Sequence, residues 1–498
     1  MRREYSVGAI TYKDMILDLG GIYAVIYDLF IYEKYNEHGN IRIVALIEEN
    51  HKDTILYEMR NSFKLLYFEK EIVTPDSQGA IDKNVQNKEE KLVEKNLFSG
   101  VITHIEFENV DGVYVLKITG KTTSYFLDIE YKNNIYQNMK MLSSEIVKEI
   151  LKSVSDKDYV YNMPDIPIDE ILVQSNETDW NLVKRFASKY ELPIFINSNS
   201  LKVKLTFGFS KIEIEGDFRF AQYVSNADID KMAYEKERTK QAVNIRDYIN
   251  YSIWVNNILP LGSRVKFKGQ SMIVGEIERY LNSGNLINRY TLYSETALKI
   301  EQNYNDMIKG ISIIGITSAI NRNMIQVQTK ENDTARNNNY WFPYASVAAS
   351  KDGNGWYCMP QIGEPVRIFF PSSDERDAYV ISYSEGYSKN SQNIEEVKGK
   401  PSNKVIYNKK GSGIIFNPAG IQIKTGSGNS SIVINNSGNI LIKGSSSVDL
   451  EALKLIRINS EDSVNISGQE IGMESETAKV ELTEDEISIN AELALFGK

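Results

Sequence analysis

Residues 431–467 read SIVINNSGNILIKGSSSVDLEALKLIRINSEDSVNIS, and this stretch decides the fold of the C-terminal fifth of the chain. Pairs of apolar residues, separated by one residue, recur in it, and each pair begins eight residues after the last. Such alternation puts both apolar side chains on one face of a short strand, and the intervening Asn, Ser and Gly residues favour turns. Each octad therefore predicts one strand and one corner. The pairs are Ile432 and Ile434, Ile440 and Ile442, Val448 and Leu450, Ile456 and Ile458, and Val464 and Ile466.

Weaker copies extend the repeat on both sides: Ile414/Phe416 and Ile421/Ile423 before it, and Ile471/Met473, Val480/Leu482 and Ile487/Ile489 after it. An octad with two inward side chains cannot close a core alone, so its apolar stripe must meet other stripes. One chain could coil with three octads per turn, or three identical chains could each supply one face of a triangular prism. We favour three chains, because one chain would complete only about three or four turns. A small sandwich or meander with the same alternation is the remaining alternative.

Length and composition restrict the class of protein. The chain has 498 residues, enough for about three domains. A formal net charge of −10 argues against a nucleic-acid binder that relies on phosphate neutralisation. A single cysteine, Cys358, excludes an intramolecular disulfide and suits a reducing compartment. The N-terminus has no long apolar segment, so we expect no signal peptide.

Strand patterns dominate the rest of the chain. Residues 22–48 predict a hairpin that turns within 36–40, and a second hairpin turns at Asp111-Gly112. Helical spacing predicts a helix from 143 capped by Ser143 or Ser144, and another capped by Thr178 that ends before Pro193. The charged residues 70–97 predict a surface excursion or short helix.

The expected regions are a first strand-rich region with helices (1–200), a second strand-rich region (201–305), a five-stranded barrel (306–386), a linker (387–404) and the repeat (405–498). The five β runs of the small barrel are separated by Gly, Asn and Pro residues. The linker is poor in apolar residues and rich in Ser, Asn and Lys.

This order of segments resembles the VgrG family, the trimeric spikes of type VI secretion systems, and the related hub and needle proteins of contractile phage tails. Residues 98–103, FSGVIT, resemble a strand of the family's first hub barrel. Residues 174–186, QSNETDWNLVKRF, resemble its signature of a Gln, an acidic residue and Asp-Trp leading into a helix. Residues 261–293 resemble the strands that close the second hub barrel.

The resemblance continues into the small barrel and the repeat. Residues 312–384 resemble the family's oligonucleotide-binding-type (OB) barrel, and the octads that follow resemble the needle in position and period. The motif residues in the barrel are Trp341, Gly355, Trp356, Met359, Pro360, Ile362, Gly363, Glu364 and Val366. The charged insert at 70–97 and the first 20 residues depart from the family pattern, so the particular contractile system stays open.

The resemblance implies a fold and a set of partners. The fold would be mainly β: a first hub β-barrel region with helices (1–200), a second hub β-barrel region (201–305), an OB-fold neck (306–386) and an intertwined triple-stranded β-helix, or β-prism, needle (405–498). The implied partners are two further copies of the chain, an Hcp-like inner-tube protein, baseplate proteins, a PAAR-like tip protein and effectors carried as cargo. Such a particle would be assembled in the bacterial cytoplasm and exported on firing.

Few residues suggest chemistry. His38, His51 and His104 are not spaced as metal ligands with Cys358, and we expect neither a metal nor a cofactor. Cys358 lies between aromatic residues and Pro360, where a buried small apolar residue is expected. The carboxylates of Asp374, Glu375 and Asp377 surround Arg376, a pattern that favours a solvated loop over a catalytic site.

Exposed aromatic residues beside basic ones would favour a ligand site in the OB barrel. Trp341, Trp356, Phe369 and Phe370 instead have apolar neighbours, which favours core or trimer packing. Residues 461–492 contain ten acidic residues and one lysine, Lys479, which favours a solvated shaft over a surface for a basic partner. Leu493, Leu495 and Phe496 then predict an apolar platform for a conical tip protein, or a plug in the last rung.

The sequence therefore predicts a homotrimeric, non-enzymatic spike that caps an inner tube and pierces a target envelope when the particle contracts. A phage or tailocin hub and spike is the nearest alternative. A tail-associated hydrolase would need an acid–base pair, which we do not find. A glycan-binding adhesin would use Trp341 or Trp356 in the small barrel.

Overall fold

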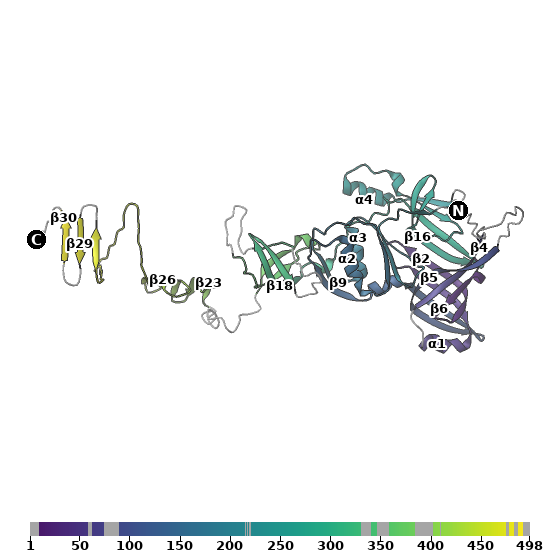
Figure 1. The fold of residues 1–498 in the computed structure, drawn as a ribbon, viewed down its shortest axis with the longest axis horizontal. Helices are drawn as coiled ribbons and strands as arrows, with labels where there is room; N and C mark the ends of the chain where they lie inside the picture. The colour runs from purple at the N-terminus through teal and green to yellow at the C-terminus, as the bar shows by residue number, and fades with distance from the viewer. Residues whose placement is uncertain are drawn as a thin grey trace, which may run out of the picture. The chain divides into compact units, whose positions relative to one another are not determined.

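A computed structural model describes the chain over residues 9–57, 62–73, 89–214, 216, 218, 221–329, 340–345, 358–383, 402–408, 410–474, 478–482 and 487–491. The chain is mainly β and divides into two compact units, Met1–Glu385 and Gly386–Lys498 (Figure 1). In the described part of the chain, no helix is both long and apolar enough to cross a membrane.

The first strands of the chain form a closed six-stranded barrel. They are β1 (Met15–Asp18), β2 (Tyr23–Lys34), β3 (Asn40–Ile47), β4 (Ser62–Val73), β5 (Glu89–Val110) and β6 (Val113–Thr122). Their order is β1-β4-β5-β6-β3-β2, and β1 also pairs with β2, which closes the barrel. Both predicted hairpins are confirmed. Asp111 and Gly112 have φ angles of 51° and 86°, as a tight hairpin turn requires.

Of the two alternatives expected for residues 70–97, a surface excursion or a short helix, the helix is wrong for the residues described there. Residues 70–73 end β4 and residues 89–97 begin β5, with Val73 paired to Glu89 in an antiparallel ribbon. The segment between them lies outside the described residues.

A second set of strands continues the same sheet. It comprises β12 (Glu213–Ile214), β13 (Gln222–Ala227), β14 (Ile249–Trp254), β15 (Arg264–Phe267), β16 (Gln270–Asn282) and β17 (Asn285–Tyr293). Strand β16 pairs with β2, so the two groups make one twelve-stranded sheet. Across this joint Arg279 Nη1 donates to the Glu33 carboxylate at 2.6 Å, and both side chains are buried. Ser283 and Gly284, with φ angles of 49° and 81°, form the tight turn between β16 and β17.

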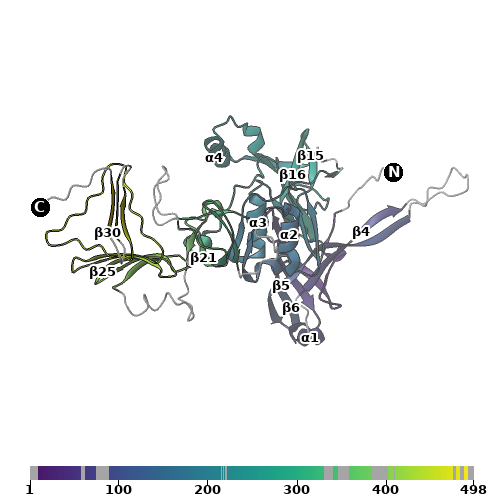
Figure 2. The same cartoon turned by 60° about the vertical axis from the view of Figure 1, so that its left-hand side comes forward.

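Helices and further short strands complete the first unit. They are α1 (Lys52–Tyr57), β7 (Tyr131–Tyr136), α2 (Ser143–Ile150), β8 (Lys157–Tyr161), β9 (Leu172–Thr178), α3 (Asp179–Ser188), β10 (Ile194–Ile196), β11 (Val203–Phe207) and α4 (Ile229–Thr239). The 3-10 helices are η1 (Tyr12–Asp14), η2 (Glu49–His51), η3 (Thr123–Asp128), η4 (Leu151–Ser153), η5 (Ile245–Tyr248), η6 (Asp306–Ile308) and η7 (Glu375–Asp377). Figure 2 shows α2 and α3 beside each other, between the barrels and the strand labelled β21.

The helix caps were only partly predictable. Thr178 caps α3 as expected, because its hydroxyl oxygen accepts from the N–H of Asn181 at 3.2 Å. The expected Ser143 or Ser144 cap of α2 is wrong. Leu142 takes the N-cap position, and its N–H donates to the Glu145 carboxylate at 2.8 Å. The N–H of Ser144 is satisfied by Asp165, at 3.1 Å, which no local pattern could reveal.

Five strands close a small barrel, the neck, in the order β20-β19-β18-β21-β22. They are β18 (Ser312–Asn321), β19 (Met324–Thr329), β20 (Phe342–Pro343), β21 (Pro365–Phe369) and β22 (Tyr379–Ser382). A bridge between Tyr344 and Val380 joins the two ends. The expectation of five short β runs is confirmed.

The core of the neck contains residues from the preceding part of the first unit, up to residue 305, which we call the hub. Ile135 of β7, Ile171, and Val173 of β9 are at most 1% exposed and pack in the same cluster as Ile325 and Phe342 of the neck. Neck and hub therefore share a core and bury apolar surface together.

The second unit contains two antiparallel meanders. The first contains β23 (Lys404–Tyr407), β24 (Gly413–Asn417), β25 (Gly420–Lys424), β26 (Ser430–Asn435) and β27 (Ile440–Gly444), and the second contains β28 (Ile471–Glu474), β29 (Ala478–Leu482) and β30 (Ile487–Ala491). Residues 445–470, which are all described, form no strand within one chain, in contrast to the strands predicted at Val448/Leu450, Ile456/Ile458 and Val464/Ile466. A strand needs a partner strand for its backbone groups, and one chain does not provide it there.

Replacing Ile171 by Ala tests the shared core. We expect the change to lower the free energy of unfolding by about 2–5 kcal/mol, because it leaves a cavity between β9 and the neck. Chemical denaturation followed by the fluorescence of the four tryptophans measures the loss. Ile166→Ala is the matched control, since Ile166 is 52% exposed and should change stability by less than about 0.5 kcal/mol. Equal effects of the two substitutions would contradict the shared core.

Candidate functional site

The segment with the predicted Gln, acidic and Asp-Trp signature is a buried polar network. Gln174, Glu177, Asp179 and Trp180 are each less than 9% exposed. The Asp179 carboxylate accepts from Gln174 Nε2 at 2.9 Å, Lys132 Nζ at 2.6 Å and Ser153 Oγ at 2.6 Å. Asp179 begins α3, so these bonds fix the start of the helix against β7 and β9. The signature is therefore structural in this chain.

Nearly two turns further along α3, Arg185 joins the hub to the neck. Its guanidinium donates from Nε to Glu177 Oε1 at 3.0 Å and from Nη2 to Glu177 Oε2 at 2.9 Å. Nη1 donates to Glu375 Oε1 at 2.5 Å, across 190 residues of sequence. Nη2 also donates to the carbonyl of Val173 at 2.7 Å. A single buried side chain thus connects α3, β9 and η7 of the neck.

The solvated-loop interpretation of residues 374–377 is wrong for Glu375, which is only 2% exposed. The solvated-loop interpretation holds for Arg376, which is exposed. Its Nη2 lies 2.6 Å from Asp374 Oδ2. The sequence alone could not distinguish the buried Glu375 from its neighbour Asp374, because the partner of Glu375, Arg185, lies far away in the sequence.

The cation at the centre of this junction keeps its charge. Burial alone would lower the pKa of Arg185, but its hydrogen bonds to Glu177 and the charge of Glu375 raise the pKa above its ordinary value. Asn305 adds a further contact, because its Nδ2 donates to the carbonyl of Ser175 at 3.0 Å. We call the set of Glu177, Arg185, Asn305 and Glu375 the hub–neck lock.

His38 is the one buried histidine of the three. Its ring nitrogens lie 2.8 Å from Ser124 Oγ and 3.4 Å from Asp128 Oδ2, and its ring centroid lies 4.5 Å from that of Trp180. Burial lowers the pKa of His38 to about 4, although Asp128 opposes the shift. Within the described residues no group of His, Cys, Asp or Glu side chains could hold a metal ion.

The motif residues of the small barrel occupy varied environments. Trp341 is half-buried, and Gly363 takes a φ angle of 91° in the turn before β21, where its N–H donates to Thr317 O at 2.8 Å. Gly355 and Trp356 lie outside the described residues. Phe370 is fully buried, in agreement with core packing, but Cys358 is exposed, so its expected burial is wrong. Cys358 lies before β21, which begins at Pro365, and its side chain does not reach the core.

The octad side chains lie on one face of the first meander in the second unit. Ile421 is opposite Ile434, Ile423 is opposite Ile432, and Ile432 is also opposite Ile442. Directly opposite residues share a face of a sheet. This apolar face is open to solvent in a single chain: Ile432, Ile434, Ile440 and Ile442 are 37%, 42%, 68% and 53% exposed.

The remaining octad side chains, from Val448 to Ile466, are 49–68% exposed. The predicted tip platform at Leu493, Leu495 and Phe496 lies outside the described residues. An exposed apolar stripe of this length indicates an interaction surface.

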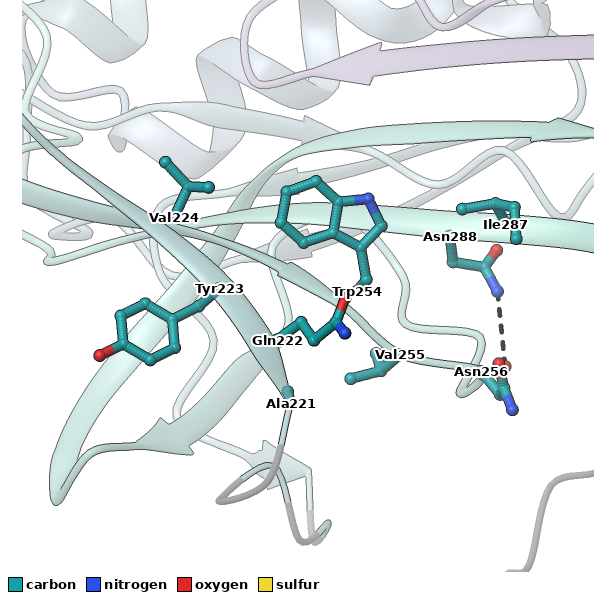
Figure 3. A pocket seen from close by; sticks show the side chains of 9 residues that line it. All are labelled: Ala221, Gln222, Tyr223, Val224, Trp254, Val255, Asn256, Ile287 and Asn288. Atoms are coloured by element: carbon teal, nitrogen blue, oxygen red, sulfur yellow. Dashed lines mark hydrogen bonds between the residues drawn. The ribbon is translucent and has the colours of Figure 1, made fainter. Parts of the chain in front are cut away.

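A second exposed feature, in the hub, was not predicted from the sequence. The hollow beside β13, of about 840 Å³, is lined by Ala221, Gln222, Tyr223, Val224, Trp254, Val255, Asn256, Ile287 and Asn288 (Figure 3). Trp254 and Val224 point to the same side of the strands, and Tyr223 points away from them. These residue types are common in strands, so the sequence did not point to a hollow here. The hollow arises because β13 lies at the end of the twelve-stranded sheet.

Comparison with known proteins agrees with this architecture. Residues 314–384 match the model of the type VI secretion system/phage-baseplate injector OB domain. VgrG in the half-lidded Francisella PdpA-VgrG complex is similar over 88% of this chain and 89% of that chain, with a TM-score of 0.51 and 10% identity. The chain has the fold of a VgrG-like spike protein. The expected resemblance is confirmed at the level of the fold, which is what a likeness at 10% identity establishes.

Two further solved structures complete the comparison. The lidless PdpA-VgrG complex covers 88% of this VgrG-like chain and 99% of its own, also with a TM-score of 0.51 and 10% identity. The Escherichia coli c3393 protein, described as a type VI secretion component, covers 73% and 98% at 13% identity, with a TM-score of 0.47. No curated protein matches the chain.

Replacing Arg185 by Ala tests the hub–neck lock. We expect a loss of about 3–5 kcal/mol in the free energy of unfolding, because Glu177 and Glu375 would remain as buried, unpaired charges. The matched control is Arg376→Ala, which removes an arginine that is 58% exposed and should cost at most about 1 kcal/mol. Adding Glu177→Gln and Glu375→Gln to Arg185→Ala should restore part of the loss. No difference between Arg185→Ala and Arg376→Ala would refute the lock.

His38 predicts a specific pH dependence of stability. Its folded-state pKa of about 4 lies below the ordinary value of 6.5, so the unfolded chain binds the proton more tightly. The stability it contributes is present above pH 6.5 and is lost as the pH falls towards 4. Between pH 7 and pH 5 this loss is about 2 kcal/mol. In chemical denaturation at both pH values, His38→Gln should show a smaller loss than the unmodified chain, whereas the exposed-site control His104→Gln should not.

Proposed function

We propose that this chain is the homotrimeric spike of a contractile injection system, which caps the inner tube and is driven into a target envelope. The coarser statement, a hub and spike fold of the phage-baseplate and type VI kind, rests on the matched OB domain and the fold comparison. The finer statement is carried by one observation. The ten octad side chains are open to solvent in a single chain, and those in the first meander lie on one face of it.

Three copies could bury the apolar octad side chains that one copy leaves exposed. Fully burying an isoleucine is worth about 1.5–3 kcal/mol, and ten octad side chains per chain are available for burial on a common axis. The stretch 445–470 forms no strand by itself and carries six of these side chains. Intertwining would give its backbone groups partner strands and would remove the free edges of the meanders.

The hub–neck lock suggests how a load would pass along the spike. A needle pushed from behind must transmit compression through the neck, and a neck on a loose linker would rotate instead. Arg185, together with the core that Ile171 and Val173 share with the neck, resists this rotation. The proposed mechanism is therefore mechanical and requires no catalytic residue.

The proposed partners follow from the same assembly. The hub would contact an Hcp-like inner-tube protein and baseplate proteins, and Leu493, Leu495 and Phe496 would seat a PAAR-like tip protein. Effectors would travel as cargo. The net charge of −10 makes nucleic acid an unfavourable partner. The spike would be assembled in the bacterial cytoplasm and leave the cell on firing.

Charge placed on the apolar face tests the proposal. In Ile440→Asp or Ile456→Asp, three carboxylates would meet on the axis of the prism, and we expect the trimer to be lost. Size-exclusion chromatography at matched concentrations measures the loss. Ser446→Asp, at an exposed position between octad pairs, is the control and should remain trimeric. A trimer of unchanged stability in both isoleucine variants would refute an inward-facing repeat.

A further inference from the structure

The charged segment of the first barrel projects beyond its neighbouring strands. Strand β1 covers β4 only as far as the pairing of Met15 with Tyr67, and β6 covers β5 only from Gly100 onwards. Residues 68–73 and 89–94 therefore continue as a two-stranded ribbon, and Figure 2 shows its β4 end standing clear of the barrel. A two-stranded ribbon by itself is marginally stable in water. A docking partner would explain why it persists.

One edge of this ribbon is suited to pairing. The N–H of Ser99 donates to the carbonyl of Ser198 at 2.6 Å, and residues 95–97 line a hollow together with residues 197–199. The base of the ribbon is therefore held within the chain. Residues 89–94 lie beyond this anchor, and among the described strands only β4 pairs with them. Leu92 in this segment is 62% exposed. An apolar side chain thus stands on a free strand edge.

A matching edge lies at the far end of the same sheet. Strand β13 ends the twelve-stranded sheet and pairs, within the described part of the chain, only with β14. All six of its residues, QYVSNA, are exposed, and none is charged or proline. Natural edge strands are usually protected by charge, proline or a bulge. The lack of such protection indicates that β13 is covered by another strand.

The hollow beside β13 supplies a place for an apolar side chain. Its size, about 840 Å³, is within the range of binding pockets, and Trp254, Val224 and Ile287 give it an apolar wall (Figure 3). The free backbone edge of β13 and this apolar wall together suit an extended polypeptide.

We propose that residues 89–94 of one copy add as a strand to the free edge of β13 in a neighbouring copy and place Leu92 in the hollow beside Trp254. Both edges offer six residues, 89–94 and 222–227. Donor and acceptor are different surfaces, so the contact is head-to-tail and closes a ring of copies, each giving one ribbon and receiving one. The inference rests on the proposed assembly from several copies. It gives the charged insert a role in joining hubs.

Disulfide trapping tests the contact in the full-length chain. In a Cys358→Ser background, Val224→Cys is combined with Leu92→Cys or with Glu94→Cys, since both ribbon positions lie on the same side of the strand. Paired strands bring facing Cα atoms within about 4.5–5.5 Å, which permits a disulfide. Val224→Cys with Val110→Cys, an exposed site at the other end of β5, is the matched control. We expect covalent dimers and trimers on non-reducing gels at least tenfold above the control.

The solution mass of the same samples separates the two levels of the proposal. Covalent multimers specific to position 92 or 94 support the contact. A multimeric chain with no more cross-linking at 92 and 94 than at 110 overturns the contact and leaves the spike proposal standing. A monomeric chain overturns both. All substituted positions are exposed, so the variants should fold.

Discussion

A buried positive charge joins the hub to the neck in the first unit of this protein. Arg185 cannot lose its proton, and its removal from water is compensated only if Glu177 and Glu375 stay within hydrogen-bond distance. Those two carboxylates belong to the hub and to the neck. Any relative movement of hub and neck would therefore separate buried charges, and the apolar core shared by Ile171 and Val173 adds the cost of opening a cavity. The two effects act on the same joint, which makes it stiff in the direction that a spike would need.

The second unit depends on the opposite condition, a surface that one chain leaves unsatisfied. Its octad repeat aligns isoleucines on one face of a meander and leaves residues 445–470 without strand pairing. The hub shows the same incompleteness at the ribbon and at β13. One chain thus combines a rigid interior with several open edges, as expected of a subunit whose final surfaces are formed on assembly.

Local sequence patterns were sufficient to predict features that depend only on neighbouring residues. Turn residues with positive φ, such as Asp111-Gly112, specified the hairpins, and Thr178 specified the start of α3. The ordered set of motifs was sufficient for the VgrG-like fold and the OB barrel. Features decided by distant partners were not predictable. Glu375 resembled its solvated neighbours because Arg185 is 190 residues away, and the segment around Leu92 resembled a loop because its strand partner is β4.

The most direct test of this account is the mass of the purified full-length chain in solution, measured by multi-angle light scattering beside a chain that ends at Val397. The account predicts a mass of about three times 56.7 kDa for the full chain and weaker association once the repeat is removed. A full-length chain that remains at 56.7 kDa at micromolar concentration would contradict it. The octads would then have to be satisfied within a single chain.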